Sequence, residues 1–253
     1  MVKNILSQQN SYFKKVAKLK ARKYREEFGL FLVEGLRACR EAVSSNFSVE
    51  SIIMTEDFFQ AHGQDFQSHS CIVTSDTILA TLCDTKTPQG VLAVLRLPDA
   101  CVMGKNRYIY CDCIQDPGNA GTIIRSADAF GFDGVIFSGG SVDVFSPKVI
   151  RATMGSVFHI DLMTEATVET LTKAKQTGFF ITASALHGTS VDTKNMTRRD
   201  KQIFIIGNEG NGVSDAVLAL SDEIVHIPMP GQAESLNAGV AASILMYEVL
   251  RHE

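Results

Sequence analysis

The sequence predicts an α/β fold made of two domains, and three observations support this class. Apolar, β-branched runs alternate with helical patterns along the whole chain. The runs of the second half are apolar throughout, which is typical of a parallel sheet covered by helices on both faces. The chain has 253 residues, 45% of them hydrophobic, so it can bury the cores of a small and a larger domain.

A small α/β domain is expected over residues 1–97. Its strands are expected at the runs "FLVEG", "VESIIMT", "CIVTSD" and "VLAVLRL", and "LRACREAVSSN" reads as a helix. The stretch "PDACVMGKN", residues 98–106, carries proline and glycine between polar residues. It is therefore the expected linker.

A second domain is expected over residues 106–253. Its strands are expected at "RYIYCDCI", "GVIFSG", "FFITAS", "QIFIIGN" and "EIVHIP", and a last helix at about 236–251. Ligands of parallel sheets bind outside the carboxyl ends of the strands. The loops that follow these strands are therefore where functional residues are expected.

Composition indicates a cytoplasmic protein with no membrane partner. No apolar run approaches the ~20 residues of a membrane span, and the N-terminus has no apolar signal segment. The six cysteines are scattered, mostly within apolar segments, so buried thiols are expected. No second Cys/His pair has the spacing of a zinc site, and no metal is expected.

The net charge is −4, but cations gather near the N-terminus in "KKVAKLKARKYREE". The residues are Lys14, Lys15, Lys18, Lys20, Arg22, Lys23 and Arg25. A local basic patch can bind phosphates even when the whole chain is acidic. A solvated helix face explains the same residues, because Lys and Arg are good helix formers. Charge alone leaves both interpretations open.

The first unusual loop is "QDPGNAGTIIRSADAFG", residues 115–131. Asn119 is the expected N-cap of a helix that ends before Gly131. Arg125 lies about one and a half turns into this helix. It is either a surface arginine or, because its neighbours are apolar and small, an arginine with a partner.

The second unusual loop is "GNEGNG", residues 207–212, directly after a strand. Its glycines permit close approach of another backbone or a ligand. The spacing differs from the dinucleotide fingerprint G-x-G-x-x-G, so a nucleotide-phosphate cradle is not expected. Glu209 is either an exposed loop acid or a brace for the loop.

The third unusual loop lies within "IPMPGQAESLNAGVAASILMYEVLR". Pro228 and Pro230 stiffen the exit from a strand. Ser235 is expected to cap a helix that begins at Leu236, which would place Asn237 in its first turn. Capping alone would explain these residues, so this loop by itself specifies no function.

The order of the three loops is more specific than any one of them. N-x-G-x-x-x-R-S-A, then G-N-E-G-x-G, then I-P-M-P…S-L-N resembles the three motifs of the SpoU (TrmH-like) RNA ribose methyltransferases of the SPOUT superfamily. The resemblance covers residues from about 108 to 251. The first half, through "FLVEGLRACREA", resembles a substrate-binding domain of the ribosomal-protein L30e type.

The resemblance implies methyl transfer from S-adenosylmethionine to a ribose 2′-hydroxyl of RNA, a cofactor site in a deep trefoil knot, and a homodimer. The expected cofactor-binding residues are Gly207, Ile227, Met229 and Leu236. The expected catalytic residues are Arg125, Asn119, Glu209, Ser235 and Asn237. The expected RNA-binding residues are Lys18, Lys20, Arg22 and Lys23.

Within this family a matching arginine activates the ribose hydroxyl. A guanidinium keeps its proton in proteins, so we expect Arg125 to position the hydroxyl and stabilise negative charge instead of acting as a base. Ribosomal RNA is favoured as the target, because the appended domain resembles one used on ribosomal RNA. The alternatives are a transfer-RNA methyltransferase, an RNA-binding protein without activity, and an enzyme acting on a small nucleotide.

Overall fold

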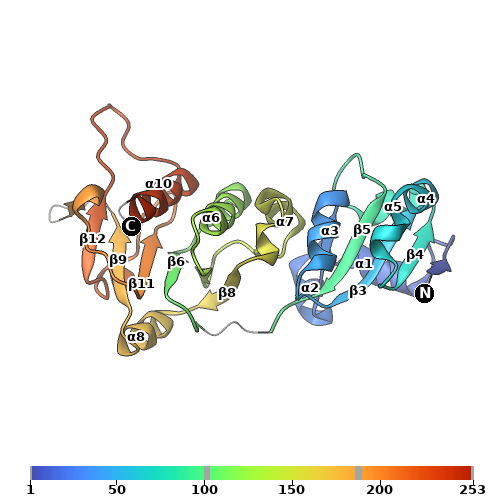
Figure 1. Cartoon of the computed structure of the whole chain (residues 1–253), viewed down its shortest axis with the longest axis horizontal. Coiled ribbons are helices and arrows are strands. Elements are labelled where there is room, and N and C mark those ends of the chain that lie inside the picture. The colour runs from blue at the N-terminus through green and yellow to red at the C-terminus, as the bar shows by residue number, and fades with distance from the viewer. Residues whose placement is uncertain (1, 100–102, 186–189, 252–253) are drawn as a thin grey trace. The chain divides into compact units, whose positions relative to one another are not determined.

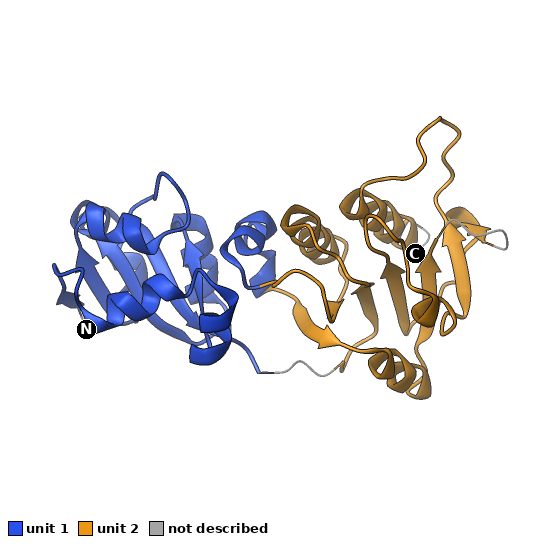
Figure 2. Ribbon diagram, turned by 180° about the vertical axis from the view of Figure 1, so that it is seen from behind, with its two compact units in different colours: residues 1–99, 145–158 blue, residues 100–144, 159–253 orange. Residues whose placement is uncertain are grey.

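The computed structural model describes residues 2–99, 103–185 and 190–251, and it divides into two compact units (Figure 2). Unit 1 comprises residues 1–99 together with 145–158, and unit 2 comprises 100–144 and 159–253. The segment 145–158 therefore joins unit 1 although it comes from the second half of the sequence. The expected linker includes Ala100, Cys101 and Val102, which lie outside the described residues.

Unit 1 contains a five-stranded sheet in the order β1-β4-β3-β5-β2 (Figure 1). Strand β5 runs antiparallel to β2 and β3, while β4 is parallel to β1 and β3. The strands are β1 (Val2–Asn4), β2 (Leu30–Glu34), β3 (Val49–Thr55), β4 (Cys71–Thr74) and β5 (Val91–Arg96). The four strands expected here are all present. Strand β1, a short exposed edge strand of three residues, was not predicted from the sequence.

Helices cover both faces of this sheet and supply its core. They are α1 (Ser11–Lys18), α2 (Arg22–Phe28), α3 (Leu36–Ser44), α4 (Glu56–His62), α5 (Asp76–Leu82), α7 (Pro147–Thr153) and the short turns η1 (Gly63–Phe66) and η2 (Ser156–Phe158). Alternate residues of β2 point to opposite faces. Leu30 and Leu32 pack with α1 and α5, whereas the Phe31 ring meets Phe145 at a centroid distance of 5.0 Å.

Unit 2 contains a seven-stranded sheet in the order β10-β12-β9-β11-β6-β7-β8, with every pair parallel. The strands are β6 (Arg107–Cys111), β7 (Gly134–Ser138), β8 (Asp161–Ala166), β9 (Phe180–Ser184), β10 (Val191–Asp192), β11 (Gln202–Ile206) and β12 (Glu223–His226). The predicted parallel sheet is confirmed. Strands β8 and β10 were not expected from the sequence.

Two helical layers enclose this sheet. The helices are α6 (Pro117–Ala129), α8 (Val168–Gln176), α9 (Asp215–Leu218), α10 (Ala238–Leu250) and the turn η3 (Thr193–Asn195). Ile203 and Ile205 of β11 share a core with α8 and α9. Phe204, between them, meets Phe132 after α6, and α10 packs on α6 and β11. The apolar run of β11 is thus explained, because both of its faces are covered.

The caps of α6 and α10 differ from those expected. Asp116 is the N-cap of α6, and its carboxylate accepts a hydrogen bond from the Asn119 N–H at 2.8 Å. The prediction of Asn119 as the cap is therefore wrong. Pro117 fits the first helical position, so the helix begins two residues before Asn119. Helix α10 begins at Ala238 and is capped by Asn237, not by Ser235.

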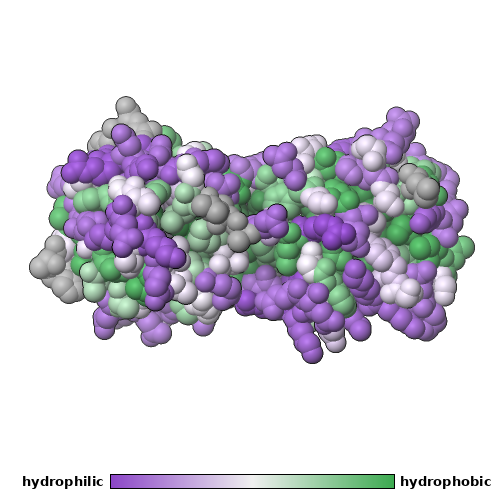
Figure 3. Space-filling model, turned by 90° about the horizontal axis from the view of Figure 1, so that it is seen from below, coloured by the Kyte–Doolittle hydropathy of each residue, from purple (hydrophilic) through white to green (hydrophobic). Residues whose placement is uncertain are grey.

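Most of the cysteines in the described part of the chain are buried, and the face shown in Figure 3 is largely hydrophilic. Cys39, Cys71, Cys83 and Cys111 are buried as free thiols, and Cys113 is half-buried. Hydrophilic residues cover much of the face shown in Figure 3, with hydrophobic ones between them. In the described part of the chain, no helix is long and apolar enough to cross a membrane.

Candidate active site

The loop after β11, residues 207–212, folds back on itself. Asn208 and Gly212 exchange two backbone hydrogen bonds, each 2.9 Å long. The Asn208 side-chain oxygen accepts from the N–H groups of Gly210 at 2.9 Å and Asn211 at 3.1 Å. Gly212 has a φ of +69°, which a residue without Cβ adopts at little cost. Asn208 and Gly212 are therefore the residues that let the loop turn back on itself.

Gly207 is the point of closest approach. A Cβ added there would lie 2.2 Å from the carbonyl carbon of Gly212 and 2.3 Å from the nitrogen of Val213. Both contacts are with backbone, which cannot rotate away as a side chain can. The glycine is therefore required first by the returning loop, and only indirectly by whatever the loop binds.

Glu209 links this loop to the start of α6. Its carboxylate accepts from the Asn119 side-chain amide at 2.7 Å and from the N–H groups of Gln115 and Asp116 at 3.5 and 3.4 Å. Burial alone would raise the pKa of the Glu209 carboxyl, but these hydrogen bonds outweigh burial and lower it. An ionised carboxylate that accepts several hydrogen bonds holds two loops together.

Asn208 makes a second link that the sequence reading missed. Its side-chain amide donates to the carbonyl of Cys113 at 2.7 Å, in the loop between β6 and α6. Asn208 and Glu209 therefore fasten the ends of the two central, adjacent strands β6 and β11 to each other. An asparagine directly after Gly207 was the available signal, because its amide can both accept from its own loop and donate to another.

A cavity of about 530 Å³ lies beside the 207–212 loop, within unit 2. Its walls come from the ends of β9, β11 and β12, the 207–212 loop and the segment leading into α10. All four expected cofactor-binding residues line it: Gly207, Ile227, Met229 and Leu236. Glu209 and Ser235 line it too. The location matches the expectation that ligands bind beyond the carboxyl ends of parallel strands.

Helix α10 packs against α6 next to this cavity. A Cβ at Gly239 would lie 3.1 Å from the side chain of Thr122. One turn further along, the hydroxyls of Ser126 and Ser243 are 2.7 Å apart. Asn237 accepts from the Val240 N–H at 3.2 Å, so its side chain is occupied in fixing the first turn of α10.

Arg125 lies on α6 one turn after Thr122, on the same side of the helix as that contact with α10. It is exposed, and its guanidinium makes no hydrogen bond or ion pair with any residue that the structure describes. The expectation of a partner within the protein is therefore not met there. Arg125 does not line the cavity, so its five donors remain available to another molecule.

The four expected RNA-binding cations belong to unit 1 and are all exposed. Lys20 donates to the carbonyl of Thr81 at 2.8 Å, and Arg22 pairs with Glu26 at 2.6 Å. Lys18 and Lys23 lie 5.1 and 5.8 Å from the centre of the Tyr24 ring.

Arg25, which belongs to the same basic run, is only 3% exposed and donates to the carbonyl of Leu19 at 2.6 Å. This cation is part of the packing of α2 and adds nothing to the surface charge. The basic patch is therefore smaller than the sequence suggests.

An all-parallel sheet with a cavity at the loops after β11 and β12 is the arrangement expected of the methyltransferase class that the three motifs indicate. The profile of the SpoU rRNA Methylase family matches residues 106–247, and that of an MRM3-like substrate binding domain matches residues 10–93. The chain belongs to the SpoU rRNA methylase family. The trefoil knot stays a prediction from this family resemblance.

Similar proteins cover nearly the whole chain. A Bacillus subtilis protein named 23S rRNA (guanosine(2553)-2′-O)-methyltransferase RlmP is 33% identical over 98% of this chain and 99% of its own. A crystal structure of an AdoMet-bound rRNA methyltransferase from Sinorhizobium meliloti has a TM-score of 0.89 at 27% identity, covering 99% and 98% of the two chains. The methyltransferase AviRb from Streptomyces viridochromogenes, in complex with AdoMet, has a TM-score of 0.84 at 28% identity, covering 96% and 98%.

The residues around the cavity fit S-adenosylmethionine. The volume lies in the range of about 300–1,000 Å³ typical of small-ligand sites. Ile227, Met229 and Leu236 supply apolar surface, and the loop at 207–212 supplies backbone groups. These residues would hold the cofactor, and Glu209 and Asn208 fix the loop beside the cavity.

Proposed function

We propose that this chain transfers a methyl group from S-adenosylmethionine to a ribose 2′-hydroxyl of ribosomal RNA. The observation that carries the proposal is the arrangement of the cavity, the 207–212 loop and α6. A cavity lined by the four motif residues lies beside a loop that Glu209 ties to α6, and α6 presents Arg125, which has no partner among the residues that the structure describes. Family membership and similarity over the full length of a 23S rRNA methyltransferase support the same reaction.

Methyl transfer to oxygen is an in-line displacement, so alignment of the two reacting groups matters most. When bound, S-adenosylmethionine supplies an electrophilic methyl carbon on a sulfonium. Gly207, Met229 and Leu236, which line the cavity, would hold it there. Helix α6 is fixed at its first turn by Asn119 and Glu209 and further along by the contact with α10. A rigid α6 gives Arg125 a defined position.

Arg125 acts on the RNA and not on the cofactor in this proposal. Its guanidinium donates to the ribose 2′-oxygen and to the neighbouring phosphate. Negative charge builds on that oxygen as the hydroxyl proton leaves to water. The oxygen loses this charge as it bonds to the methyl carbon, and the carbon–sulfur bond would break to leave a neutral thioether. A fixed cation stabilises this charge without taking up a proton. Ser235 and Asn237 shape the segment that closes the cavity.

The basic residues Lys18, Lys20, Arg22 and Lys23 are proposed to contact RNA phosphates. We further propose a homodimer that works in the cytoplasm, with residues 1–97 binding the substrate and 106–253 catalysing the reaction. An inactive RNA-binding protein is disfavoured, because every catalytic motif residue is present. Transfer RNA remains the alternative target, because several relatives are named as tRNA/rRNA methyltransferases.

The test is methyl transfer in vitro. Purified protein and S-adenosylmethionine carrying a labelled methyl group are incubated with unmodified 23S ribosomal RNA, unmodified transfer RNA, or nucleotides. Label on ribosomal RNA, mapped to a ribose 2′-oxygen, is the expected result. Label only on transfer RNA would replace the target, and label on free nucleotides or on a base would overturn the reaction proposed.

A further inference from the structure

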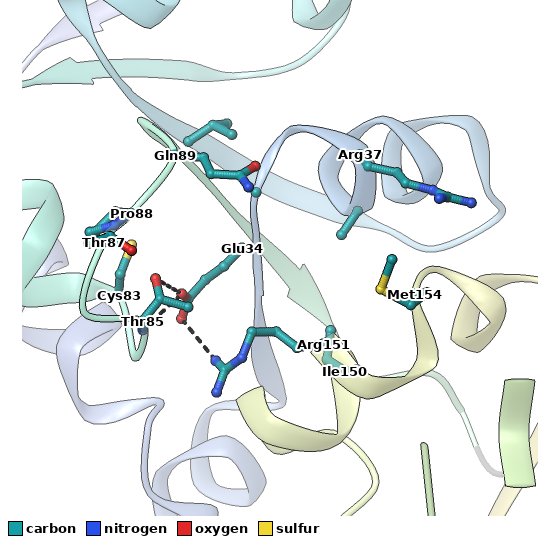
Figure 4. Close-up of a pocket in the computed structure, with 13 residues that line it drawn as sticks. Glu34, Arg37, Cys83, Thr85, Thr87, Pro88, Gln89, Ile150, Arg151 and Met154 are labelled. Carbon is teal, nitrogen blue, oxygen red and sulfur yellow. Dashed lines mark hydrogen bonds and ion pairs between the residues drawn. The ribbon is translucent and has the colours of Figure 1, made fainter. Parts of the chain in front are cut away.

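A second cavity, of about 250 Å³, lies within unit 1, and it shares no lining residue with the cavity of unit 2 (Figure 4). It is formed by the end of β2, the start of α3, the loop 83–91 and residues 150–154 around the end of α7. Its volume is slightly below the ~300–1,000 Å³ of ordinary small-ligand sites. A site of this size suits one compact group and not an extended chain.

The walls of this cavity are rigidly held. The Glu34 carboxylate, only 5% exposed, accepts from the N–H groups of Asp84 at 2.6 Å and Thr85 at 3.1 Å, and from the Thr85 hydroxyl at 2.8 Å. Arg151 donates to Asp84 at 2.8 Å and lies 4.0 Å from Glu34. Figure 4 shows this network joining the loop to α7. Its acceptor atoms are thus already used, and the Glu34 charge is compensated.

Each polar side chain left over at the cavity can donate a hydrogen bond. The oxygen of the Gln89 side chain accepts from the Leu36 N–H at 3.2 Å, which leaves its amide hydrogens unused. The Thr87 hydroxyl and the Arg37 guanidinium have no partner among the residues described. Both are exposed, and in Figure 4 Arg37 extends from α3 above Met154, at the rim. A ligand for this set must be rich in acceptors and carry negative charge at the mouth of the cavity.

The other walls are apolar. Ala38, Val91 and Ile150 line the cavity, and Met154 is 48% exposed although it is a large hydrophobic residue. Methionine adapts its shape to flat apolar groups and makes favourable contacts with aromatic rings. A flat ring with acceptor atoms on its edge, joined to an anion, meets all of these requirements.

We propose that this cavity holds one unpaired nucleotide of the RNA substrate, with its base against Ile150 and Met154 and its phosphate beside Arg37. The inference rests on the proposed function and adds to it a place where the RNA is read. RNA-binding proteins read sequence mostly from unstacked bases, which they hold against apolar surfaces and hydrogen-bond at their edges. Gln89 and Thr87 are the donors available for the base edge.

The chain offers a matched pair of variants. Arg37 and Arg40 are both exposed cations of α3, but Arg40 pairs with Asp65 at 2.6 Å and does not line the cavity. Affinity is measured directly, by filter binding of a 23S ribosomal RNA transcript to the full chain. We expect Arg37→Ala to bind about tenfold more weakly, because a charge-assisted hydrogen bond is lost, and Arg40→Ala to bind as the unchanged protein does.

A second variant tests the cavity without removing a cation. Thr87 is on an exposed loop, so Thr87→Asp should fold normally and place a carboxylate against the acceptor atoms of the base edge. RNA affinity should again fall about tenfold, while affinity for S-adenosylmethionine stays unchanged in all three variants. Equal RNA affinity of Arg37→Ala, Thr87→Asp and Arg40→Ala would overturn the inference.

The two proposals fail differently. If the unchanged protein binds the transcript but methylates no RNA, the proposed function fails, and the cavity is still judged by the difference between Arg37→Ala and Arg40→Ala. If the unchanged protein methylates RNA and the variants bind it normally, only the cavity proposal fails. Nucleoside monophosphates that bind at micromolar concentration and lose affinity in Thr87→Asp would assign the cavity to a free nucleotide and overturn an RNA site.

Discussion

Arg125 is defined by what surrounds it on α6. Its neighbours Ile123 and Ile124 are fully buried, whereas Arg125 itself is exposed and unpaired among the described residues. A cation with no structural partner adds little to the stability of its helix. Removing it should therefore affect chemistry and leave folding intact.

We expect Arg125→Ala to lower kcat by about a hundredfold or more at saturating cofactor, as when one donor to a developing negative charge is deleted. Affinity for S-adenosylmethionine should stay within about twofold, because Arg125 does not line the cavity. Arg125→Lys should also be poor, since an ammonium lacks the planar fork of donors. Single-turnover methylation and calorimetry measure the two effects. A folded Arg125→Ala that methylates RNA at the normal rate would show that Arg125 is an ordinary surface residue without a catalytic role.

Gly207 and Gly210 form a matched pair in one loop. A Cβ at Gly207 would overlap the backbone of Gly212 and Val213, whereas a Cβ at Gly210 would meet only the Asn208 side-chain oxygen at 3.5 Å. We therefore expect Gly207→Ala to abolish detectable binding of S-adenosylmethionine and to lower Tm by several degrees. Gly210→Ala should change neither by much. Equal behaviour of the two variants in thermal melts with and without cofactor would contradict the close approach.

Glu209 gives the loop a dependence on pH. Its hydrogen bonds lower the pKa of the carboxyl in the folded protein, so the carboxylate form favours the folded loop. That contribution is fully present above the ordinary carboxyl pKa of 4.5 and is lost as the pH falls through the lowered value. We expect cofactor affinity, measured by calorimetry, to show no effect of Glu209 titration between pH 5 and 8, because the carboxyl stays ionised there. Glu209→Gln should weaken binding throughout this range, because an amide accepts these hydrogen bonds less well; unchanged binding would argue against a brace.

Among the elements, those of the second half were largely predictable. Strand β11 carries five buried residues, so its apolar run was an unambiguous signal. Strand β8, "DLMTEA", has two exposed and two half-buried residues at the edge of the sheet, and nothing in its composition distinguishes it from a loop. Strand β10 has only two residues, so its pairing depends on β12 and not on its own sequence.

The site was predictable as a set of motif residues, but its connections were not. Gly207, Ile227, Met229 and Leu236 do gather around one cavity. The roles of Asp116 and Asn237 as caps, and of Asn208 as a link to Cys113, depend on which backbone groups lie within reach. The link to Cys113 joins loops that are distant in sequence, so spacing along the chain does not encode it. The two caps depend on where each helix begins, which the motif residues alone do not fix.

The helices α1 and α2 carry the surface cations of unit 1. Replacing Lys18, Lys20, Arg22 and Lys23 by Ala should weaken RNA binding and make its salt dependence shallower, by up to about 3 in the log–log slope for four phosphate contacts. Lys18 and Lys23 should account for most of the loss, because Lys20 and Arg22 already donate to Thr81 and Glu26.

The control for this variant removes exposed cations of unit 2, Lys173 and Lys194, and should leave the salt slope unchanged. Cofactor affinity should be the same for all of these proteins. A slope that does not change when the four cations are lost would mean that α1 and α2 present an ordinary solvated surface.

At the scale of the whole molecule, α10 leaves three large hydrophobic residues exposed. Val240 is 45%, Tyr247 50% and Leu250 42% exposed, and their spacing places them on one side of the helix. We expect a homodimer that covers this side, with a mass by light scattering of twice 27.6 kDa at micromolar concentration.

The double variant Val240→Glu with Tyr247→Glu should then be a monomer. Val168, on α8, is also an exposed hydrophobic residue but does not belong to this group on α10. Val168→Glu is therefore the matched control and should stay dimeric. A monomeric unchanged protein with full activity would exclude the assembly.

The order of strands in unit 2 also sets when activity can arise during synthesis. Strand β6 comprises residues 107–111, and its neighbour β11 comprises 202–206. At roughly 5–20 residues per second, the ribosome makes β11 roughly 5–20 s after β6. Until then, α6 and the loop at 113–116 have no partner for Asn119 or the Cys113 carbonyl. In a nascent chain this part of the site therefore stays open until the loop after β11 has been made.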